Sequence, residues 1–472
     1  MSPVPIAADL EIARIDVYQV DLGYSGGVYR LSGGRELRSF DATIVRITTQ
    51  TEIEGWGEST PFGSTYIAAH ALGIRAAIAE LAPHLIGLDP RRVDRVNDAM
   101  DAHLVGHESA KSALDLACWD IFGKSVGLPV CELLGGRTDV KLPIICSLSA
   151  GTPQEIKDEV AKFRSRGYTC FSVKVAASQD PGLDVERVEA ALKDRRPGDF
   201  FVVDANGGMT VEGALRMLKL MPPTLDFVLE QPSSKAVPIV FDELALNDAS
   251  LIQMIKDDVA EGVSIKIAKS GGLAKARRAR DICIAAGYTM CVMESAGSDI
   301  AFAAVVHLGQ TVPRRLLHCV FECREMSTGK IADGDYTHSG GFIQAPKTAE
   351  LGVTPPEDLQ RVVFDSQKYS LYPKDAQAYR LLTFLSYVAT GQQDILLTQT
   401  PQQRRANAQF AKNEEAKRGK PQSALKKKVE NKVEKLPVSK GWLYLLLFVV
   451  CGGIVFELVR IVFGAGQGWF SG

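Results

Sequence analysis

Residues 200–206 read Phe-Phe-Val-Val-Asp-Ala-Asn, an apolar run that ends in a carboxylate and an amide. Similar short β-branched runs alternate with helical stretches from Leu142 to about His318. They are Cys170 to Val175, Phe200 to Ala205, Phe227 to Glu230, Pro238 to Asp242, Ser264 to Ile267 and Thr289 to Met293. Repeated strand–helix units are typical of a parallel sheet. The sequence therefore predicts an α/β fold over residues 137–345, with a parallel sheet that is either closed into a β/α barrel or doubly wound.

A second, α+β domain precedes the barrel. Residues 10–60 alternate apolar and polar side chains in short runs broken by glycine pairs, which favours antiparallel strands. From about Tyr66 to Val126 the apolar spacing becomes helical, and the glycines at 135 and 136 end the run. We expect this domain to cover residues 1–136, and residues 346–363 to rejoin it.

Charged side chains follow the predicted barrel strands in a fixed order: Lys174, Asp204 with Asn206, Glu230, Asp242 and Lys266. The carboxyl ends of barrel strands converge on one mouth. Alternation supports this placement, because Ser172 and Lys174 share one face of their strand. A lone Lys or Asp at a strand end is more often a solvated loop boundary, but the ordered set indicates a catalytic site.

Three converging carboxylates form a hard oxygen site suited to Mg²⁺. Two lysines that face each other across such an ion would abstract or return a proton, because the cation and the second ammonium lower each lysine pKa. The expected reaction is removal of the proton next to a carboxylate, with the metal stabilising the enediolate.

These stretches resemble the enolase superfamily, and within it the muconate lactonizing enzyme and mandelate racemase group. The barrel matches are Ser172–Lys174, Val203–Asn206, Leu229–Pro232, Phe241–Glu243 and Ile265–Gly272; matches in the first domain are Gly55–Glu58, Ala110–Asp115, Cys118–Asp120 and Glu132–Gly136. The resemblance implies a capping domain on a barrel, Lys174 and Lys266 as paired bases, and Asp204, Glu230 and Asp242 as Mg²⁺ ligands. Lys269 is expected to point to the other face.

Substrate choice follows from the loops that close over the barrel mouth in this family. The segment from Leu31 to Arg35, the stretch from Ser39 to Asp41, Tyr66 and Gly106-His107 are similar to enzymes that dehydrate cis-3-hydroxy-L-proline or epimerise proline betaines. We therefore expect Tyr66, Asn206 and Ser39 to bind a small carboxylate or amino-acid substrate. A β-hydroxyl would leave after proton removal; without one, the second lysine would reprotonate the other face.

One strand–helix unit is shorter than its neighbours. Only seven residues, 231–237, separate Glu230 from Pro238, whereas a parallel crossover with its helix needs about ten or more. We expect that a segment has been lost from this unit and that the barrel is destabilised. Catalysis then depends on whether the shortened unit is tolerated.

The nine cysteines are scattered without CxxC spacing, which indicates a reducing compartment, and the N-terminus does not look like a signal peptide. Residues 364–400 form a predicted linker. Residues 401–440 hold twelve Lys and Arg against four Glu, so this basic cytosolic segment should attract anionic partners.

Residues 441–463 form an apolar run long enough to span a bilayer, with Trp442, Phe448 and Phe456 in the span. Few residues follow it, which is typical of a tail anchor. The stretch from Gln402 to Phe463 resembles the stress-associated endoplasmic-reticulum proteins in Arg404–Asn407, Lys435–Ser439 and Phe448–Gly452. This resemblance implies the endoplasmic reticulum membrane, with the enzyme domain cytosolic and the translocon or ribosome nearby.

Three hypotheses remain open: a tail-anchored Mg²⁺-dependent dehydratase, a racemase or epimerase using the same residues, and a non-catalytic endoplasmic-reticulum membrane protein with a damaged barrel as passenger. Metal binding separates the third from the others. The barrel is also expected to form a homo-oligomer.

Overall fold

The computed structural model describes residues 10–31, 35–178, 180–230, 237–356, 359 and 362–365. All of them belong to one compact unit, residues 1–374; the second unit, residues 375–472, lies outside the described residues. The predicted linker from residue 366 on, the basic segment and the membrane helix, with Trp442, Phe448 and Phe456, therefore lie outside them too, whereas residues 364 and 365 are described as strand. Within the described residues, no helix has both the length and the hydropathy to cross a bilayer.

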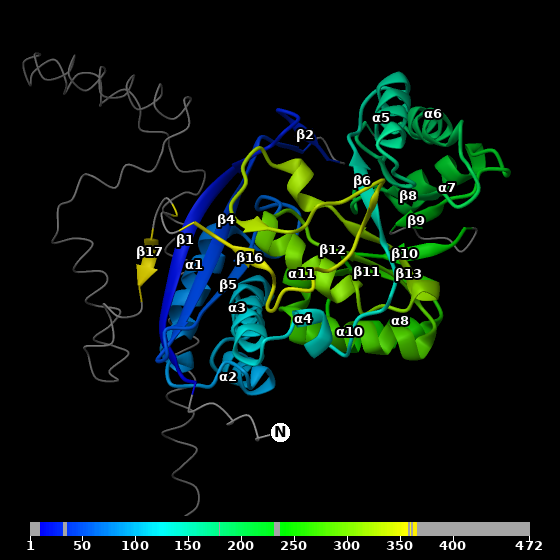
Figure 1. Ribbon diagram of the computed structural model, residues 1–472. Coiled ribbons are helices and arrows are strands. Elements are labelled where there is room, and N and C mark those ends of the chain that lie inside the picture. The colour runs from blue at the N-terminus through cyan, green and yellow to red at the C-terminus, as the bar shows by residue number, and fades with distance from the viewer. Residues whose placement is uncertain are drawn as a thin grey trace, which may run out of the picture. The chain divides into compact units, whose positions relative to one another are not determined.

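The first domain is an antiparallel sheet with helices packed on it (Figure 1). Its strands lie in the order β17-β1-β4-β5, so the last described strand pairs with the first. Their bounds are β1 Ile12–Gly23, β4 Ser39–Thr49, β5 Glu54–Ser59 and β17 Val362–Asp365, with a small ribbon of β2 Tyr29–Arg30 and β3 Glu36–Leu37. The helices are α1 Ala71–Leu85, α2 Val93–His103, α3 Glu108–Val126 and α4 Val130–Leu133.

Helix α3 lies between β5 and the barrel and is buried along most of its length. Gly57 explains the close packing, because a Cβ there would lie 1.9 Å from the carbonyl oxygen of Ala113. Glu58, the next residue, reaches the barrel instead. Its carboxylate accepts hydrogen bonds from the amide groups of Ser298 and Ala301, at the start of α11. The strand thus fixes the first domain on the barrel.

The second domain is a closed barrel of eight parallel strands, in which the eighth strand pairs with the first. The strands are β6 Leu142–Leu148, β7 Cys170–Lys174, β8 Phe200–Asp204, β9 Val228–Glu230, β10 Ile239–Phe241, β11 Gly262–Lys266, β12 Thr289–Met293 and β13 Leu317–Phe321. The helices are α5 Pro153–Ser165, α6 Pro181–Leu192, α7 Val211–Leu220, α8 Asp248–Asp257, α9 Ile267–Ser270, α10 Leu273–Ala286 and α11 Asp299–Gly309. The predicted barrel is therefore confirmed.

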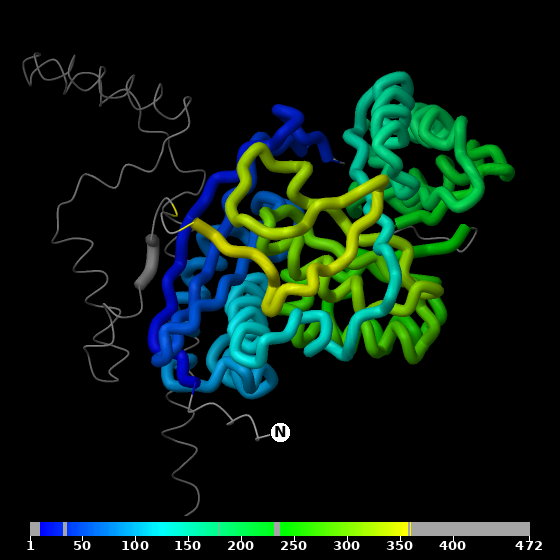
Figure 2. Tube along the Cα trace, viewed as in Figure 1, coloured from blue at the N-terminus to red at the C-terminus, as the bar shows by residue number. Residues whose placement is uncertain are grey.

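The stretch after β13 returns to the first domain, as the yellow part of the tube in Figure 2 shows. It contains a short 3₁₀ turn at Cys323–Met326 and the strands β14 Asp333–Gly334, β15 Phe342–Ile343 and β16 Val353–Thr354; another 3₁₀ turn, Arg314–Leu316, directly precedes β13. Bridges from Ser327 to Tyr24 and from Glu350 to Pro129 join this return to the first domain. Residues far apart in sequence therefore close the two domains into one unit.

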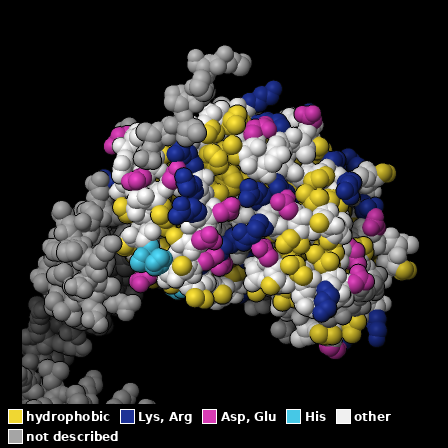
Figure 3. Space-filling view, turned by 90° about the horizontal axis from the view of Figure 1, so that it is seen from below, with side chains coloured by type: hydrophobic (Ala, Val, Ile, Leu, Met, Phe, Trp, Pro, Cys, Tyr) yellow, Lys and Arg dark blue, Asp and Glu magenta, His cyan; other side chains and the backbone are white. Residues whose placement is uncertain are grey.

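The shortened unit lies between β9 and β10. The two strands still pair in parallel, with Ile239 opposite Leu229 and Val240 opposite Glu230, but no helix is described between them and residues 231–236 lie outside the description. Apolar side chains are exposed on the two flanking elements: Leu215 and Leu220 on α7, and Leu244, Leu246 and Ile252 from the end of β10 to α8. Figure 3 shows exposed hydrophobic side chains among charged ones on the face seen from below, which carries α8 and α10.

Candidate active site

Strand geometry places the predicted site residues at one end of the barrel. Lys174 and Asp204 are opposite each other across β7 and β8, and Asp204 is opposite Glu230 across β8 and β9. Lys266 ends β11. In the closed eight-strand order, β11 is four strands away from β7. The two lysines therefore approach the barrel mouth from opposite sides, with the three carboxylate-bearing strands between them.

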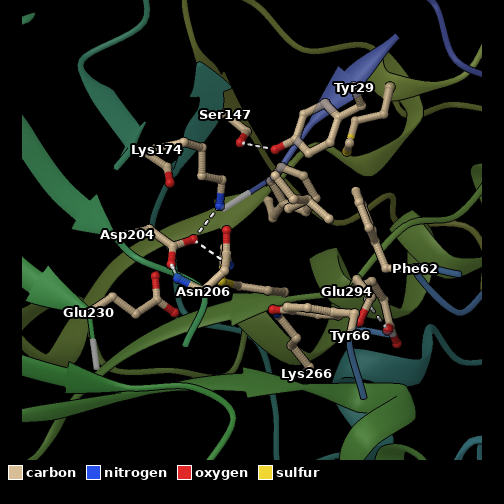
Figure 4. A pocket seen from close by; sticks show the side chains of 16 residues that line it. Tyr29, Phe62, Tyr66, Ser147, Lys174, Asp204, Asn206, Glu230, Lys266 and Glu294 are labelled. Carbon is tan, nitrogen blue, oxygen red and sulfur yellow. Dashed lines mark hydrogen bonds and ion pairs between the residues drawn. The ribbon is translucent and has the colours of Figure 1, made fainter. Parts of the chain in front are cut away.

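A pocket at this mouth is lined by sixteen residues from both domains (Figure 4). Lys174, Asp204, Asn206, Glu230 and Lys266 all line it, as do Tyr66, Tyr29, Leu31 and Phe62 from the first domain, together with Ser147, Ser172, Met293, Glu294, Ser295, Phe321 and Met326. The barrel thus supplies the charged side chains, and the first domain supplies aromatic and apolar side chains that close the pocket over them.

Lys174 and Asp204 form one buried ion pair. Burial disfavours the charged amine, but the attraction of Asp204, followed by the effects of Tyr29 and Glu230, outweighs burial and raises the pKa of Lys174. Asn206 holds the carboxylate from the other side, since its backbone N–H donates to Oδ1 at 2.7 Å and its Nδ2 to Oδ2 at 2.9 Å. A left-handed backbone conformation at Asn206, with φ of 43°, turns the amide back toward Asp204.

Lys266 and Asp242 form the second buried pair. Burial opposes the charge on Lys266, but Asp242, Glu243 and Glu230 raise its pKa. Asp242 also accepts a hydrogen bond from the Tyr66 hydroxyl at 2.9 Å, and Lys266 contacts that hydroxyl. Asp242 does not line the pocket itself; it lies beside Lys266 and Tyr66.

Lys269 lines a groove beside α8 and not this pocket, but it also reaches a predicted site residue. Helix α9 begins directly after β11 and turns Lys269 back toward the barrel, where its ammonium lies 2.7 Å from Oδ1 of Asp242. Asp242 thus contacts two ammonium groups. Although burial raises its pKa, Lys266 and Lys269 hold the pKa of Asp242 well below the usual range.

Glu230 lies between the two pairs and accepts a hydrogen bond from Ser264 at 3.3 Å. Burial and the charges of Asp204 and Asp242 raise its pKa well above the usual range. The carboxylates of Asp204, Glu230 and Asp242 therefore repel one another, and together they require positive charge nearby.

The chemistry of the three carboxylates suits a divalent cation, although their side chains do not converge into one coordination site. Among the described residues, no three His, Cys, Asp or Glu side chains lie in an arrangement that could hold a metal ion, because Asp204 and Asp242 are turned to their lysines. Buried, mutually repelling carboxylates are nevertheless the hard oxygen donors that Mg²⁺ prefers. Asn206 Oδ1 adds a buried oxygen with no hydrogen-bond partner in the described structure.

The predicted substrate residues are divided by the structure. Tyr66 and Asn206 line the pocket, whereas Ser39 begins β4 opposite Gly23 and is not among its lining residues. Gly106 and His107 line a separate groove beside α8. Of the segment 31–35, Leu31 lines the pocket and Arg35 donates to the carbonyl oxygen of Asn206 at 3.3 Å; residues 32–34 lie outside the described residues.

Sequence reasoning missed Glu294. It directly follows the apolar run of β12, as Glu230 follows β9, and that position was the available signal. The side chain is 4% exposed and lines the pocket. Its Oε1 accepts from the amide of Ala268 at 2.8 Å, and burial with the nearby Glu58 raises the pKa of Glu294 to about 8, against the opposing effect of that hydrogen bond.

Comparison with known proteins agrees with this geometry. Residues 37–135 match the model of the mandelate racemase / muconate lactonizing enzyme N-terminal domain, and residues 155–359 match that of the enolase C-terminal domain-like family. Residues 398–462 match the ribosome associated membrane protein RAMP4. The segment of this last match lies outside the described residues.

Two curated relatives cover much of the chain. A cis-3-hydroxy-L-proline dehydratase of Roseibium aggregatum is 35% identical over 361 residues, covering 74% of this chain and 98% of the relative. An N-succinyl-L-Arg/Lys racemase of Bacillus cereus is 29% identical and covers 56% and 75%. One relative is thus a dehydratase and the other a racemase.

Two crystal structures resemble the chain closely. A protein of the mandelate racemase/muconate lactonizing enzyme type from Aspergillus oryzae has a TM-score of 0.72 and 57% identity, covering 76% of this chain and 100% of its own. One from Roseovarius nubinhibens, complexed with magnesium, has a TM-score of 0.74 and 47% identity, covering 75% and 100%. The chain belongs to the mandelate racemase/muconate lactonizing enzyme family of the enolase superfamily.

Proposed function

We propose that the chain removes the proton next to the carboxylate of a cyclic amino acid and dehydrates cis-3-hydroxy-L-proline. The observation that carries the proposal is the placement of two buried lysines on opposite sides of one pocket, with acidic strand ends between them. The 35% identical dehydratase supports the choice of substrate.

Asp204, Glu230 and Asp242 would hold a magnesium ion. When bound, the ion neutralises these carboxylates and stabilises negative charge on the substrate carboxylate. Without the ion, each of these carboxylates raises the pKa of a lysine. Neutralising the carboxylates would therefore favour the free amine that a base requires. Lys174 then takes the α-proton, and Tyr29, Phe62 and Tyr66 exclude water over the pocket.

The test is to follow cis-3-hydroxy-L-proline by NMR with the full-length chain, in magnesium and after chelation. We expect a pyrroline carboxylate product only with magnesium. A rate equal to that of the enzyme-free control in both conditions contradicts the proposal.

Epimerisation is the second candidate, because Lys266 faces Lys174 across the pocket and would return a proton to the opposite face. The racemase among the relatives supports it. L-proline separates the two reactions, since it lacks a leaving group. Formation of D-proline at a rate comparable with dehydration favours the epimerase, whereas dehydration alone favours the lyase.

We propose in addition that residues 441–463 anchor the chain by its tail in the endoplasmic reticulum membrane, close to the translocon. The support is the match of residues 398–462 to the ribosome associated membrane protein. Carbonate extraction of cell membranes tests this: the full chain should stay in the pellet, and a chain ending at residue 400 should not. Release of the full chain contradicts the anchor.

A further inference from the structure

We propose that Glu294 is a further catalytic residue: the acid that protonates the departing hydroxyl group. The inference rests on the proposed dehydration and assigns a residue to its second step, the departure of the hydroxyl group. It starts from a stereochemical requirement. In a cis-3-hydroxyproline the hydroxyl shares a ring face with the carboxylate, so the α-hydrogen projects from the opposite face. The base and the acid must therefore reach the ring from opposite sides.

Glu294 lies on the side opposite Lys174. It follows β12, which pairs with β11, and Met293 is opposite Lys266 in that pairing. Lys174 ends β7, on the other side of the closed barrel. Figure 4 shows Glu294 near Tyr66 and Lys266, across the pocket from Lys174. With Lys174 as base, Glu294 is a carboxyl group of the pocket on the side where the hydroxyl leaves.

The surroundings of Glu294 suit a proton donor. Its side chain is almost fully buried, and the groups whose charges act on it are Glu58 and Lys266. A buried carboxyl beside another carboxylate retains its proton near neutral pH. Oε1 is fixed by the amide of Ala268 at 2.8 Å, whereas Oε2 has only a long contact, 3.4 Å, with the amide of Ser295. Oε2 is therefore the oxygen able to donate.

The step balances without another reactant. The Lys174 amine takes the α-proton, the C–H electron pair forms the carbon–carbon double bond, and the C–O bond breaks. The Glu294 proton passes to the leaving oxygen and gives water, so the products are a pyrroline carboxylate, water, an ammonium on Lys174 and a carboxylate on Glu294. Solvent returns both groups to their starting states.

Glu294→Gln keeps the size and the acceptor oxygen of the side chain but removes the acid. We compare it with the wild-type full-length chain on cis-3-hydroxy-L-proline with magnesium in deuterium oxide. We expect dehydration to fall about 100-fold or more, the range for loss of a general acid. Recovered substrate should instead gain deuterium at the α-carbon, because Lys174 still removes the proton and returns a solvent deuteron.

Glu261→Gln is the matched control. Glu261 also accepts an amide hydrogen bond from a neighbouring strand, that of Ile239 at 2.7 Å, but it precedes β11 at the other end of the barrel. Its substitution should leave both reactions within about threefold of wild type. Melting temperatures of both variants within a few degrees of wild type exclude unfolding as the cause.

Three results decide the matter. Dehydration by Glu294→Gln at the wild-type rate overturns this inference and leaves the proposed function intact. Loss of dehydration and exchange together, in a folded variant, also overturns it, because Glu294 would then act on substrate binding or proton removal. A wild-type chain that neither dehydrates nor exchanges overturns the proposed function itself, and the inference with it.

Discussion

Two sectors of the barrel contribute to the same pocket but are built differently. The β11–β12 sector is complete: α10 Leu273–Ala286 connects its strands, and it supplies Lys266 and Glu294. The β9–β10 sector has no described helix between its strands, yet it places Glu230 in the pocket and Asp242 beside it. Strand pairing and alternation therefore suffice to position the charged groups. We expect helix cover to affect mainly the stability of the barrel wall.

The largest expected effect is on activity, and it concerns both sectors equally. Glu230→Gln in the short sector and Lys266→Met in the complete sector should each reduce dehydration about 1,000-fold, because one removes a charge that holds the metal and the other a group that faces the ring. Steady-state rates with magnesium measure this. Full activity of Glu230→Gln, beside an inactive Lys266→Met, would show that the short sector has no part in the site.

Core truncations compare the stability of the two walls. Ile265 in β11 is 3% exposed and Leu229 in β9 is 2% exposed. Ile265→Ala should lower the free energy of unfolding by about 3 kcal/mol, in the range for large-to-small substitutions. Leu229→Ala should cost less, because its wall can collapse around the smaller side chain. Urea unfolding measures both, and an equal or larger loss for Leu229→Ala contradicts the comparison.

Metal binding should stabilise the barrel, because Asp204 at the end of β8 and Glu230 and Asp242 of the short sector would share the ion. With magnesium at 100 times its dissociation constant, the free energy of unfolding should rise by about 2.7 kcal/mol. Thermal unfolding with and without chelator detects this without any substrate. Asp204→Asn should abolish the shift, whereas Glu261→Gln should retain it; a shift that survives in Asp204→Asn indicates another site.

The free energy of unfolding should depend on pH through His307, which lies in α11 on the complete side of the barrel. Burial lowers the pKa of this histidine to about 4, and its Nδ1 accepts a hydrogen bond from the amide of Cys131 at 3.0 Å. The folded state favours the neutral ring, so the contribution of His307 to the free energy of unfolding is complete above the unfolded imidazole pKa of about 6.5. That contribution is lost as the pH falls from there toward 4.

At pH 5 the loss from His307 amounts to about 2 kcal/mol. In His307→Gln, the difference in unfolding free energy between pH 7.5 and pH 5 should shrink by that amount. Urea unfolding at the two pH values provides the measurement. If this difference is the same in His307→Gln as in the wild type, the acid sensitivity arises from other groups, such as those of the short sector.

Sequence reasoning predicted the residues that strands place and missed those that depend on local turns or packing. Lys174, Asp204, Glu230 and Lys266 follow from alternation and strand order alone. The contact of Lys269 with Asp242 was missed because a four-residue helix, α9, turns this lysine back toward the carboxylate.

Three other differences have separate causes. Ser39 was expected at the substrate, but pairing of β4 with β1 holds it in the sheet of the first domain, and no strand pattern reveals how that domain meets the barrel. Glu294 has the same strand-end signal as Glu230, so it was detectable. The short unit was seen in the sequence, but closure of the barrel despite it depends on the pairing of β9 with β10, which the sequence does not display.

The central claim is that Asp204 at the end of β8, together with Glu230 and Asp242 of the short sector, holds one metal ion between the two lysines. A crystal of the full-length chain with Mn²⁺ replacing magnesium, measured for anomalous scattering, tests it most directly. We predict one strong peak bounded by the carboxylates of Asp204, Glu230 and Asp242, with the ammonium groups of Lys174 and Lys266 released toward the pocket. No peak at this position, with both lysine–aspartate pairs intact, would contradict the account.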